Sequence, residues 1–537
     1  MAAASPHVRA TLPPFAFECR PGAAARRPAP AQYRRREPEK TPLHQVVREN
    51  LESLLADARQ RNDSGSGYPA FVEKEFRHFV NCGLLAGGFA RLRCPACHHE
   101  QLVAFSCKGR ICPSCWARRA SDIAAHLVDK VLPVAPYRQW VLTFPWELRL
   151  LLAFDTAFLS EMTGAFLKIL FAWQRLRGRR LGLRDGETGS VTFVQRFGGV
   201  ANLNPHLHVL VPDGLFLPAT GDTLTFEPLP PPDDQELRHL VVRIATRLGN
   251  LATRRIEEAG KKAEWQWPRP DKALLHTDGA EALRSPRDPR RKPGPTLGLT
   301  ETDREEDHKP LCDSADGFSL HAARTVAPRD RDSLEALCRY GLRAPFSNDR
   351  LTLEPDGRVR LRLLRPWANG RTDVVMEPLA LMRRLAVLVP APYQNLVRYH
   401  GVFANRSKCR PRLPKPPPNL DAPLPAPAPL SPKPTTTTDK RRERVPWAAL
   451  LRRVLDVDAL ACPRCSTPMI ILAFLTDPPV VRKILLHLGL PAEPPVLAPA
   501  RCCYDEPAYL SDFAPDPPFF DDEAPPPVTG WTARAPP

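Results

Sequence analysis

The chain has 537 residues, 64 of them proline, and lysine plus arginine exceed aspartate plus glutamate by 17. This length allows more than one hydrophobic core, and the positive charge favours a polyanionic partner such as nucleic acid, although basic residues also keep proteins soluble. No apolar run approaches the roughly 18 residues of a membrane helix, and no apolar signal core stands at the N-terminus. Membrane and secreted proteins are therefore excluded at this stage, and we expect a cytoplasmic protein with no membrane partner.

Composition separates the segments that should fold from those that should not. Proline-rich or strongly charged stretches cannot bury enough apolar surface, so we expect disorder or extended linkers there. These stretches are the basic tail 1–42, the charged insertion 284–316, the linker 411–446 and the acidic tail 491–537. Three ordered pieces remain: a helix plus zinc-binding domain over 43–130, a main domain over 135–410, and a small helical module over 447–490.

Two cysteine pairs lie near the N-terminus, Cys94-Pro-Ala-Cys97 and Cys112-Pro-Ser-Cys115, with 14 residues between them. This spacing is close to that of a four-cysteine zinc ribbon, in which four thiolates fill the tetrahedral ion and make it structural. Disulfides are disfavoured because nothing signals secretion. Other residues could replace a ligand, although we prefer the two pairs: Cys82, His98, His99 and Cys107.

Four basic residues surround the second cysteine pair. A zinc ribbon that carries them would present a positively charged face to phosphates, so we predict that they bind DNA. They are Lys108, Arg110, Arg118 and Arg119.

Two alternating segments follow, 190–197 and 202–214, joined by a glycine-rich turn that predicts an antiparallel hairpin. Side chains alternate along a strand, so His206 and His208 should share one face and could hold a metal there. Gln195 should lie close to them as a neutral oxygen ligand. The alternative is a half-buried strand with two solvent-facing histidines and a surface glutamine.

Tyr340 lies late in a segment whose apolar spacing predicts a helix over 329–342, between Arg339 and Arg343. A phenol is a poor nucleophile when neutral, but neighbouring arginines and a metal on the scissile phosphate reduce that handicap. Attack would leave DNA linked through phosphotyrosine, which a free 3′-hydroxyl can reverse. The alternative is a tyrosine that packs its ring into the core.

A further pair, Cys462-Pro-Arg-Cys465, follows an amphipathic basic stretch and supplies only half a metal site. Cys502 and Cys503 could complete it, but they lie in the proline-rich tail. A helical module with unmetallated thiols is an equally good interpretation, and the sequence leaves this zinc unassigned.

With these residues in hand, the chain resembles the rolling-circle insertion-sequence transposases of the insertion-sequence-91 type, which belong to the HUH (His-hydrophobic-His) endonuclease superfamily. The resemblance covers about 45–410, and more weakly 446–490. It rests on the two N-terminal cysteine pairs, His206-Leu-His208 and Arg339-Tyr340 in that order, with further matches at Val141 to Trp146, Gly317 to Ala322, Pro366-Trp367 and Arg398 to Gly401.

The resemblance implies an α+β fold, in which an antiparallel-sheet nuclease domain with flanking helices follows a zinc-binding domain. It implies that His206 and His208 hold Mg²⁺ or Mn²⁺, of which Mn²⁺ suits imidazole better, and that Tyr340 is the nucleophile. The implied activity is bacterial, nucleoid-associated DNA transposition, by nicking and rejoining single-stranded DNA at element ends through a 5′-phosphotyrosine. Target DNA and a host helicase are the implied partners.

Some family members carry two tyrosines four residues apart on this helix, whereas positions 336 and 344 are alanine here. The resemblance is therefore to the single-tyrosine branch, in which strand exchange uses a second subunit of a homo-oligomer, a 3′-hydroxyl or Tyr340 again. The chain also reads Arg343-Ala-Pro345 where family members commonly have Arg-Pro-Pro.

Two other functions fit part of the pattern. A non-catalytic zinc-ribbon DNA-binding protein would need only the cysteines and the basic charge, with His206, His208 and Tyr340 as structural residues. A replication initiator or relaxase would share the nuclease core, but the chain lacks the Gly-x-x-x-x-Gly-Lys-Ser/Thr loop of an attached helicase, which favours the transposase.

Overall fold

The structure of the protein is a computed structural model. Most of the expected disordered stretches lie outside the residues it describes, although 38–40, inside the expected basic tail, form a short 3₁₀ helix. The described residues are 31–33, 35–62, 65–219, 221–261, 273–286, 310–367, 370–416, 446–455, 457–501 and 513–515.

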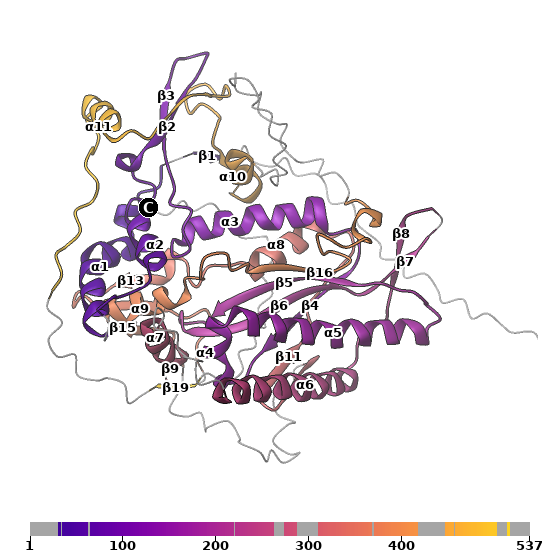
Figure 1. Ribbon diagram of the computed structural model, residues 1–537. Coiled ribbons are helices and arrows are strands. Elements are labelled where there is room, and N and C mark those ends of the chain that lie inside the picture. The colour runs from indigo at the N-terminus through magenta and orange to yellow at the C-terminus, as the bar shows by residue number, and fades with distance from the viewer. Residues whose placement is uncertain are drawn as a thin grey trace, which may run out of the picture.

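A seven-stranded antiparallel sheet forms the centre of the protein (Figure 1). Its longest strands are β5 (Gly189–Phe197) and β6 (Leu203–Pro212), which form the expected hairpin and are buried along their whole length. The strand order is β10-β11-β4-β6-β5-β16, with β12 also paired to β4. The remaining strands are β4 (Tyr137–Thr143), β10 (Cys312–Ala315), β11 (Phe318–His321), β12 (Thr325–Val326) and β16 (Val397–Gly401).

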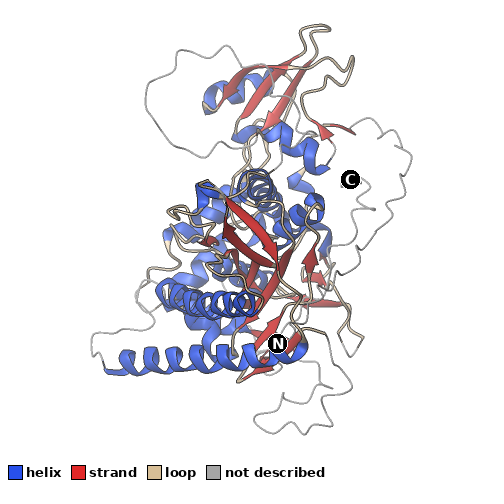
Figure 2. Ribbon diagram, turned by 90° about the vertical axis from the view of Figure 1, so that its right-hand side faces the viewer, coloured by secondary structure: helices blue, strands red, loops and turns tan. Residues whose placement is uncertain are grey.

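Helices cover both faces of this sheet and make three layers. Apolar side chains of β6 such as Leu207 and Val209 face α5 (Thr156–Arg180) and α6 (Asp234–Lys261). The other face packs against α3 (Pro113–His126), a π-helical turn at Leu127–Val131, and α8 (Arg331–Gly341). Figure 1 shows α3 and α8 above the sheet and α5 and α6 below it, and Figure 2 shows the same molecule turned by 90°. Burial on both faces explains why the histidines do not face solvent.

The N-terminal part packs against one end of this layered body. Its α1 begins after Thr41, whose hydroxyl accepts from the His44 amide, with Pro42 in the first turn. A second core joins these N-terminal helices to a small sheet and to helices from the middle of the chain. Its elements are α1 (Pro42–Gln60), α2 (Ala70–Val80), α4 (Trp146–Phe154), α7 (Ala273–Leu283), β13 (Leu351–Leu353), β14 (Val359–Arg362), β15 (Asp373–Met376) and α9 (Pro378–Leu388).

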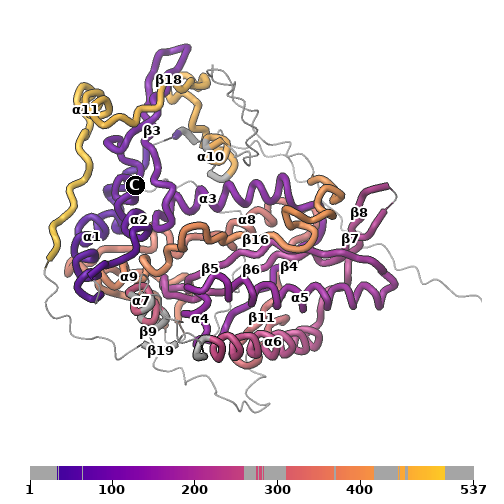
Figure 3. The backbone as a smooth tube through the Cα atoms, in the orientation of Figure 1, coloured from indigo at the N-terminus to yellow at the C-terminus, as the bar shows by residue number. Residues whose placement is uncertain are grey.

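A third sheet contains two strands from the N-terminal part of the chain and one from the C-terminal part. The hairpin of β2 (Phe89–Arg93) and β3 (Glu100–Ala104) accepts β18 (Ile470–Leu475) beside β2, in the order β18-β2-β3. The C-terminal segment therefore returns to the N-terminal domain (Figure 3). Its other elements are α10 (Trp447–Leu455), β17 (Val457–Asp458), which pairs with β1 (Ala31–Gln32), and α11 (Pro478–His487).

The segment 447–490, expected as a small helical module, contains the helices α10 and α11 and also the strand β18, which belongs to a shared sheet. Two short strand pairs complete the described strands: β7 (Gly214–Pro218) with β8 (Leu224–Pro228), and β9 (Arg284–Pro286) with β19 (Phe513–Pro515). Among the described helices, none alone has the length and apolar composition of a membrane span. Only α4 and α5 taken together, with a bend of 118° between them, meet that criterion.

Candidate active site and metal centres

His206 and His208 lie side by side on β6 and point to the face covered by α8, with ring centroids 4.9 Å apart. His206 Nδ1 lies 2.7 Å from the carbonyl oxygen of Asn204, which can only accept, so Nδ1 carries the proton and Nε2 has a lone pair. His208 Nδ1 lies 2.9 Å from the side-chain amide of Gln139. The Asn204 contact therefore orients His206 Nε2 towards a metal. His208 Nε2 has the same role when the side-chain amide of Gln139 turns its oxygen, in place of its nitrogen, to Nδ1.

Gln195 lies directly opposite His206 in the β5–β6 register, so the two side chains share one face. Its amide nitrogen donates to the backbone carbonyl of Tyr340 at 3.0 Å. Its Oε1 is buried and has no hydrogen-bond partner within the described part of the chain. The hydrogen bond to α8 thus fixes the amide with its oxygen available as a ligand.

Tyr340 lies in the last turn of α8, with its ring 5.8 Å from that of His208 in an edge-to-face arrangement. Gly341 makes this close approach possible, because a β-carbon there would lie 2.8 Å from the Phe193 ring on β5. Asp330 caps the start of the helix by accepting from the Ser333 amide at 2.9 Å. The helix therefore ends where its tyrosine meets the histidine strand.

Of the two arginines that flank Tyr340 in the sequence, only Arg343, which follows the end of α8, joins the site. Its guanidinium lies 4.5 Å from the centre of the Tyr340 ring. Arg339 instead forms an ion pair with Glu335 one turn earlier on α8, at 3.4 Å. The structure thus gives Arg343 a place beside the phenol and gives Arg339 a partner within its own helix.

The sequence reasoning missed two polar residues of the same sheet face. Gln139 on β4 contacts His208, as described above. His321 on β11 pairs with Val141 of β4, which in turn pairs with His208, so all three share one face. Both residues lie in strands other than that of the histidine pair, and only the strand order brings them to it. No spacing in the sequence could have signalled this.

A cleft of about 1120 Å³ opens beside this site. It lies between α3, the end of β5, the loop that follows Tyr340 and the start of α10. Its lining includes Gln195 and Arg343 of the site, and also all four residues predicted near the second cysteine pair: Lys108, Arg110, Arg118 and Arg119. Residues far apart in the sequence thus give one cleft a concentrated positive charge.

The electrostatics of Arg110 reflect this crowding. Burial, and then the nearby charge of Arg119, lower the pKa of Arg110 to about 10. The group stays charged at neutral pH, and its guanidinium lies 5.7 Å from the centre of the Trp116 ring. Trp116 in turn donates to the Leu342 carbonyl at 2.6 Å, which ties α3 to the loop after Tyr340.

The cysteines form two separate four-thiol clusters, so the expected single site of Cys94, Cys97, Cys112 and Cys115 is wrong. The physical reason is the β2–β3 hairpin, whose five-residue strands place its tip roughly 17 Å from its base. The first cysteine pair lies at the tip and the second lies beyond the base. One cluster is Cys82, Cys107, Cys112 and Cys115, and the other is Cys94, Cys97, Cys462 and Cys465.

The first cluster has the geometry of a structural zinc site. Cys82 Sγ lies 3.7 Å from Cys112 Sγ and 3.5 Å from Cys115 Sγ. Zn–S bonds of about 2.3 Å in a tetrahedron separate neighbouring sulfurs by roughly 3.8 Å. Four thiolates leave no open position, so the ion supports folding and takes no part in chemistry, as expected. Cys82 and Cys107, weighed as substitutes, are ligands here; His98 and His99 belong to neither cluster.

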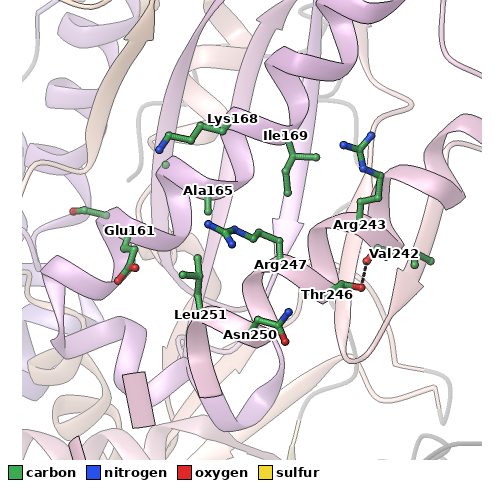
Figure 4. A pocket seen from close by; sticks show the side chains of 12 residues that line it. Glu161, Ala165, Lys168, Ile169, Val242, Arg243, Thr246, Arg247, Asn250 and Leu251 are labelled. Carbon is green, nitrogen blue, oxygen red and sulfur yellow. Dashed lines mark hydrogen bonds between the residues drawn. The ribbon is translucent and has the colours of Figure 1, made fainter. Parts of the chain in front are cut away.

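A second hollow, of about 620 Å³, lies on the other side of the sheet between α5 and α6 (Figure 4). Small residues of α5, Gly164 and Ala165, leave this groove open, and Lys168 and Arg247 reach into it from the two helices. It contains no tyrosine, histidine or cysteine. The histidine pair, Gln195 and Tyr340 therefore lie together on the other face of the sheet, the face that α8 covers.

His208 should make the metal-free protein sensitive to acid. Burial, then the charges of His206, Arg343 and His321, hold its pKa well below the ordinary 6.5. Below about pH 6.5, His208 binds a proton in the unfolded chain but stays neutral in the folded protein. The free energy of unfolding therefore falls by up to about 1.4 kcal/mol for each pH unit of acidification. Thermal unfolding between pH 7.5 and 5.5 should show a smaller acid loss in His208→Gln than in wild type.

The control for this measurement is His239→Gln, which changes an exposed histidine on α6. It should keep the full acid sensitivity of wild type. Equal acid losses in wild type and His208→Gln would contradict the assignment.

Two family models match the chain. A family described as "Putative transposase" matches residues 189–410, which contain both histidines, Gln195 and Tyr340. A family described as "Transposase zinc-binding domain", of the insertion-sequence-91 type, matches residues 51–144, which contain the whole first cysteine cluster. Neither the curated proteins nor the solved structures include a match to the chain. On the two family matches, with zinc-binding and transposase parts in this order, the chain belongs to the insertion-sequence-91-type transposases.

Proposed function

We propose that this transposase nicks and rejoins single-stranded DNA at the ends of a mobile element, with Tyr340 as nucleophile in a nuclease domain of the HUH type. The observation that carries the proposal is the contact between α8 and the histidine strand, which sets the Tyr340 ring 5.8 Å from His208. A tyrosine, two imidazoles and an arginine meet beside a basic cleft. A purely structural role for these residues would not require that they converge.

The residues fit a divalent ion. Gln195 Oε1 is a buried acceptor without a hydrogen-bond partner among the residues that the structure describes, and His206 presents Nε2 through its contact with Asn204. His208 Nε2 is also buried without such a partner, and it becomes an acceptor when the Gln139 amide turns its oxygen to Nδ1. We propose that these three atoms hold Mg²⁺ or Mn²⁺. Two nitrogen ligands favour Mn²⁺ in vitro. When bound, the ion would polarise the scissile phosphate and neutralise its developing charge.

The protein's own residues would position the two reacting groups. The phenol oxygen of Tyr340 attacks phosphorus as the bond to the 3′-oxygen breaks, which leaves a 5′-phosphotyrosine and a free 3′-hydroxyl. The phenol gives its proton to solvent water, and the departing 3′-oxygen takes a proton from solvent water. Arg343, stacked on the Tyr340 ring, supplies positive charge where the phenolate forms. Attack by a 3′-hydroxyl on the phosphotyrosine reverses the step and joins strands without ATP.

The basic cleft would hold the DNA strand that leads to Tyr340. Lys108 and Arg118 are exposed on it, and Arg110 and Arg119 are partly buried. Phosphate contacts of this kind position a strand without reading its sequence. The family resemblance leads us to propose target DNA, a host helicase and a second subunit as further partners.

The nucleophile is tested with Tyr340→Phe, which removes one oxygen and keeps the ring that contacts His208 and Arg343. Strand cleavage of single-stranded element-end DNA in Mn²⁺ should fall by at least about 1000-fold, because the attacking atom is gone. Binding of the same DNA should be unchanged. EDTA should abolish cleavage by wild type.

Cleavage by Tyr340→Phe at the wild-type rate would contradict the proposal that Tyr340 is the nucleophile. Wild-type protein that binds element-end DNA without cutting it would instead favour a zinc-ribbon DNA-binding protein. The matched control is Tyr393→Phe, because Tyr393 is fully exposed outside the cleft lining. It should cut at the wild-type rate.

The cleft is tested with a double variant, Lys108→Ala with Arg118→Ala. Each lost phosphate contact should lower the slope of log Kd against log salt by about 0.7 for single-stranded DNA, so the pair should lower it by about 1.4. Affinity should fall to a similar extent for all sequences. Mobility-shift titrations at several salt concentrations measure both effects.

Lys168→Ala with Arg247→Ala is the matched control, since it removes the same two charges from the groove between α5 and α6. It should keep the wild-type slope. The assignment of the cleft fails if both double variants lose the same slope or if neither does.

A further inference from the structure

The second cysteine cluster joins residues from opposite ends of the chain. Cys94 Sγ lies 3.4 Å from Cys465 Sγ, and Cys97 Sγ lies 3.5 Å from the Sγ atoms of both Cys462 and Cys465. A disulfide needs about 2.05 Å between sulfurs, so these are not disulfides. The distances approach the roughly 3.8 Å between thiolates around tetrahedral zinc.

The two cysteine pairs of this cluster have the same backbone turn. The amide of Cys94 donates to the carbonyl of His99 at 2.8 Å, and the amide of Cys462 donates to the carbonyl of Thr467 at 3.0 Å, five residues on in each case. In each pair the residue after the second cysteine, His98 or Ser466, has a left-handed backbone, with φ of 56° and 60°. Its amide donates to the carbonyl of the first cysteine, at 3.1 Å and 2.8 Å.

These matched turns also aim amide groups at sulfur. The Cys97 amide donates to Cys94 Sγ and the Arg464 amide donates to Cys462 Sγ, both at 3.5 Å. Hydrogen bonds to a thiolate stabilise its charged form, which is the form that binds metal. The pair Cys112 and Cys115 differs, because α3 begins between them at Pro113. Two like knuckles therefore face one another.

The same knuckles lie beside the sheet that unites the chain ends. The strand β18 pairs with β2 from Ile470 opposite Arg93 to Leu475 opposite Phe89. Around the thiols, Leu92 and Met469 pack in one apolar cluster, and Phe89 packs with Val481 of α11 in another. The cluster therefore lies at a folded contact between the N-terminal hairpin and the C-terminal segment.

The C-terminal segment reaches the DNA cleft through α10, which lies a short connection before Cys462. Arg453 of α10 pairs with Asp129 at 2.6 Å and with Glu335 of α8, the helix that carries Tyr340. Pro446 and Leu450 line the cleft. One segment thus touches the thiol cluster at one end and the cleft at the other.

We propose that Cys94, Cys97, Cys462 and Cys465 hold a second structural zinc ion that clasps the C-terminal segment onto the β2–β3 hairpin and so keeps α10 in place as a wall of the DNA cleft. The role of α10 as a wall of the DNA cleft rests on the proposed function. The zinc ion that links the C-terminal segment to the hairpin does not depend on that function. The ligand pairs are separated by more than 360 residues, so the ion closes the chain into one large loop.

The metal site is tested by the zinc content of full-length protein. Wild type should carry two zinc ions per chain and Cys462→Ser with Cys465→Ser should carry one. Cys409→Ser, which changes a cysteine outside both clusters, should keep two. Two ions in the double variant, or only one in wild type, would overturn the proposal.

The clasp is tested by cutting the chain. A site-specific protease sequence inserted between residues 430 and 431 allows the full-length folded protein to be cleaved between β16 and the C-terminal segment that begins with α10. The C-terminal fragment should remain bound in gel filtration, and chelation or the double cysteine change should reduce the bound fraction at least roughly tenfold. Equal retention with and without zinc would overturn the clasp.

The wall is tested by binding of single-stranded DNA to uncut protein. Cys462→Ser with Cys465→Ser, and separately Arg453→Ala, should each raise Kd by roughly three- to tenfold, since both loosen α10. Unchanged Kd in both variants would overturn the wall. Zinc content and fragment retention need no strand cleavage, so failure of the Tyr340 mechanism would leave those results intact.

Discussion

The close packing of α8 on the histidine strand is the constraint on which the rest of the candidate site depends. Gly341 lets the helix end against Phe193, and the Gln195 amide holds the Tyr340 carbonyl. Without both contacts, the distance and orientation of Tyr340 in one layer relative to the two histidines in the other would not be fixed. A shift of about 1 Å is enough to cost a preorganised site much of its rate, which is why such sites are built on rigid elements.

The supporting structure around this contact includes a four-cysteine cluster and ion pairs as well as apolar packing. The first cysteine cluster holds the start of α3, whose Trp116 binds the loop after Tyr340. From α10, the guanidinium of Arg453 forms an ion pair with the carboxylate of Glu335 on α8, which is almost fully buried. A buried carboxylate needs such a partner, because an unpaired charge there would cost several kcal/mol. The helix that carries the tyrosine is therefore held by groups from both ends of the chain.

Local patterns in the sequence were enough to predict the hairpin and the helix that carry the candidate site. Alternation over 190–197 and 202–214 predicted the β5–β6 hairpin, and its register brought Gln195 opposite His206 as expected. The apolar spacing before Tyr340 predicted a helix over 329–342, and α8 spans Arg331–Gly341. These features depend on contacts between neighbours in the sequence, which period and turn chemistry can specify.

Contacts between residues far apart in the sequence could not be predicted from local patterns. Spacing alone joined Cys97 to Cys112, whereas the hairpin between them separates the two pairs, and the true partners Cys462 and Cys465 lie more than 360 residues away. Gln139 and His321 reach the site only through the strand order of the sheet. Such contacts are decided by how elements pack, and one sequence carries no signal of it.

The assignment of the nucleophile is tested most directly by locating the DNA on the protein. Wild-type protein is incubated with labelled single-stranded element-end DNA and Mn²⁺, denatured, digested, and the nucleotide-bearing peptide is identified by mass spectrometry. The account predicts a 5′-phosphate on Tyr340. A nucleotide on Tyr399, the other tyrosine beside the cleft, or no covalent adduct with any end sequence that the protein binds, would contradict it.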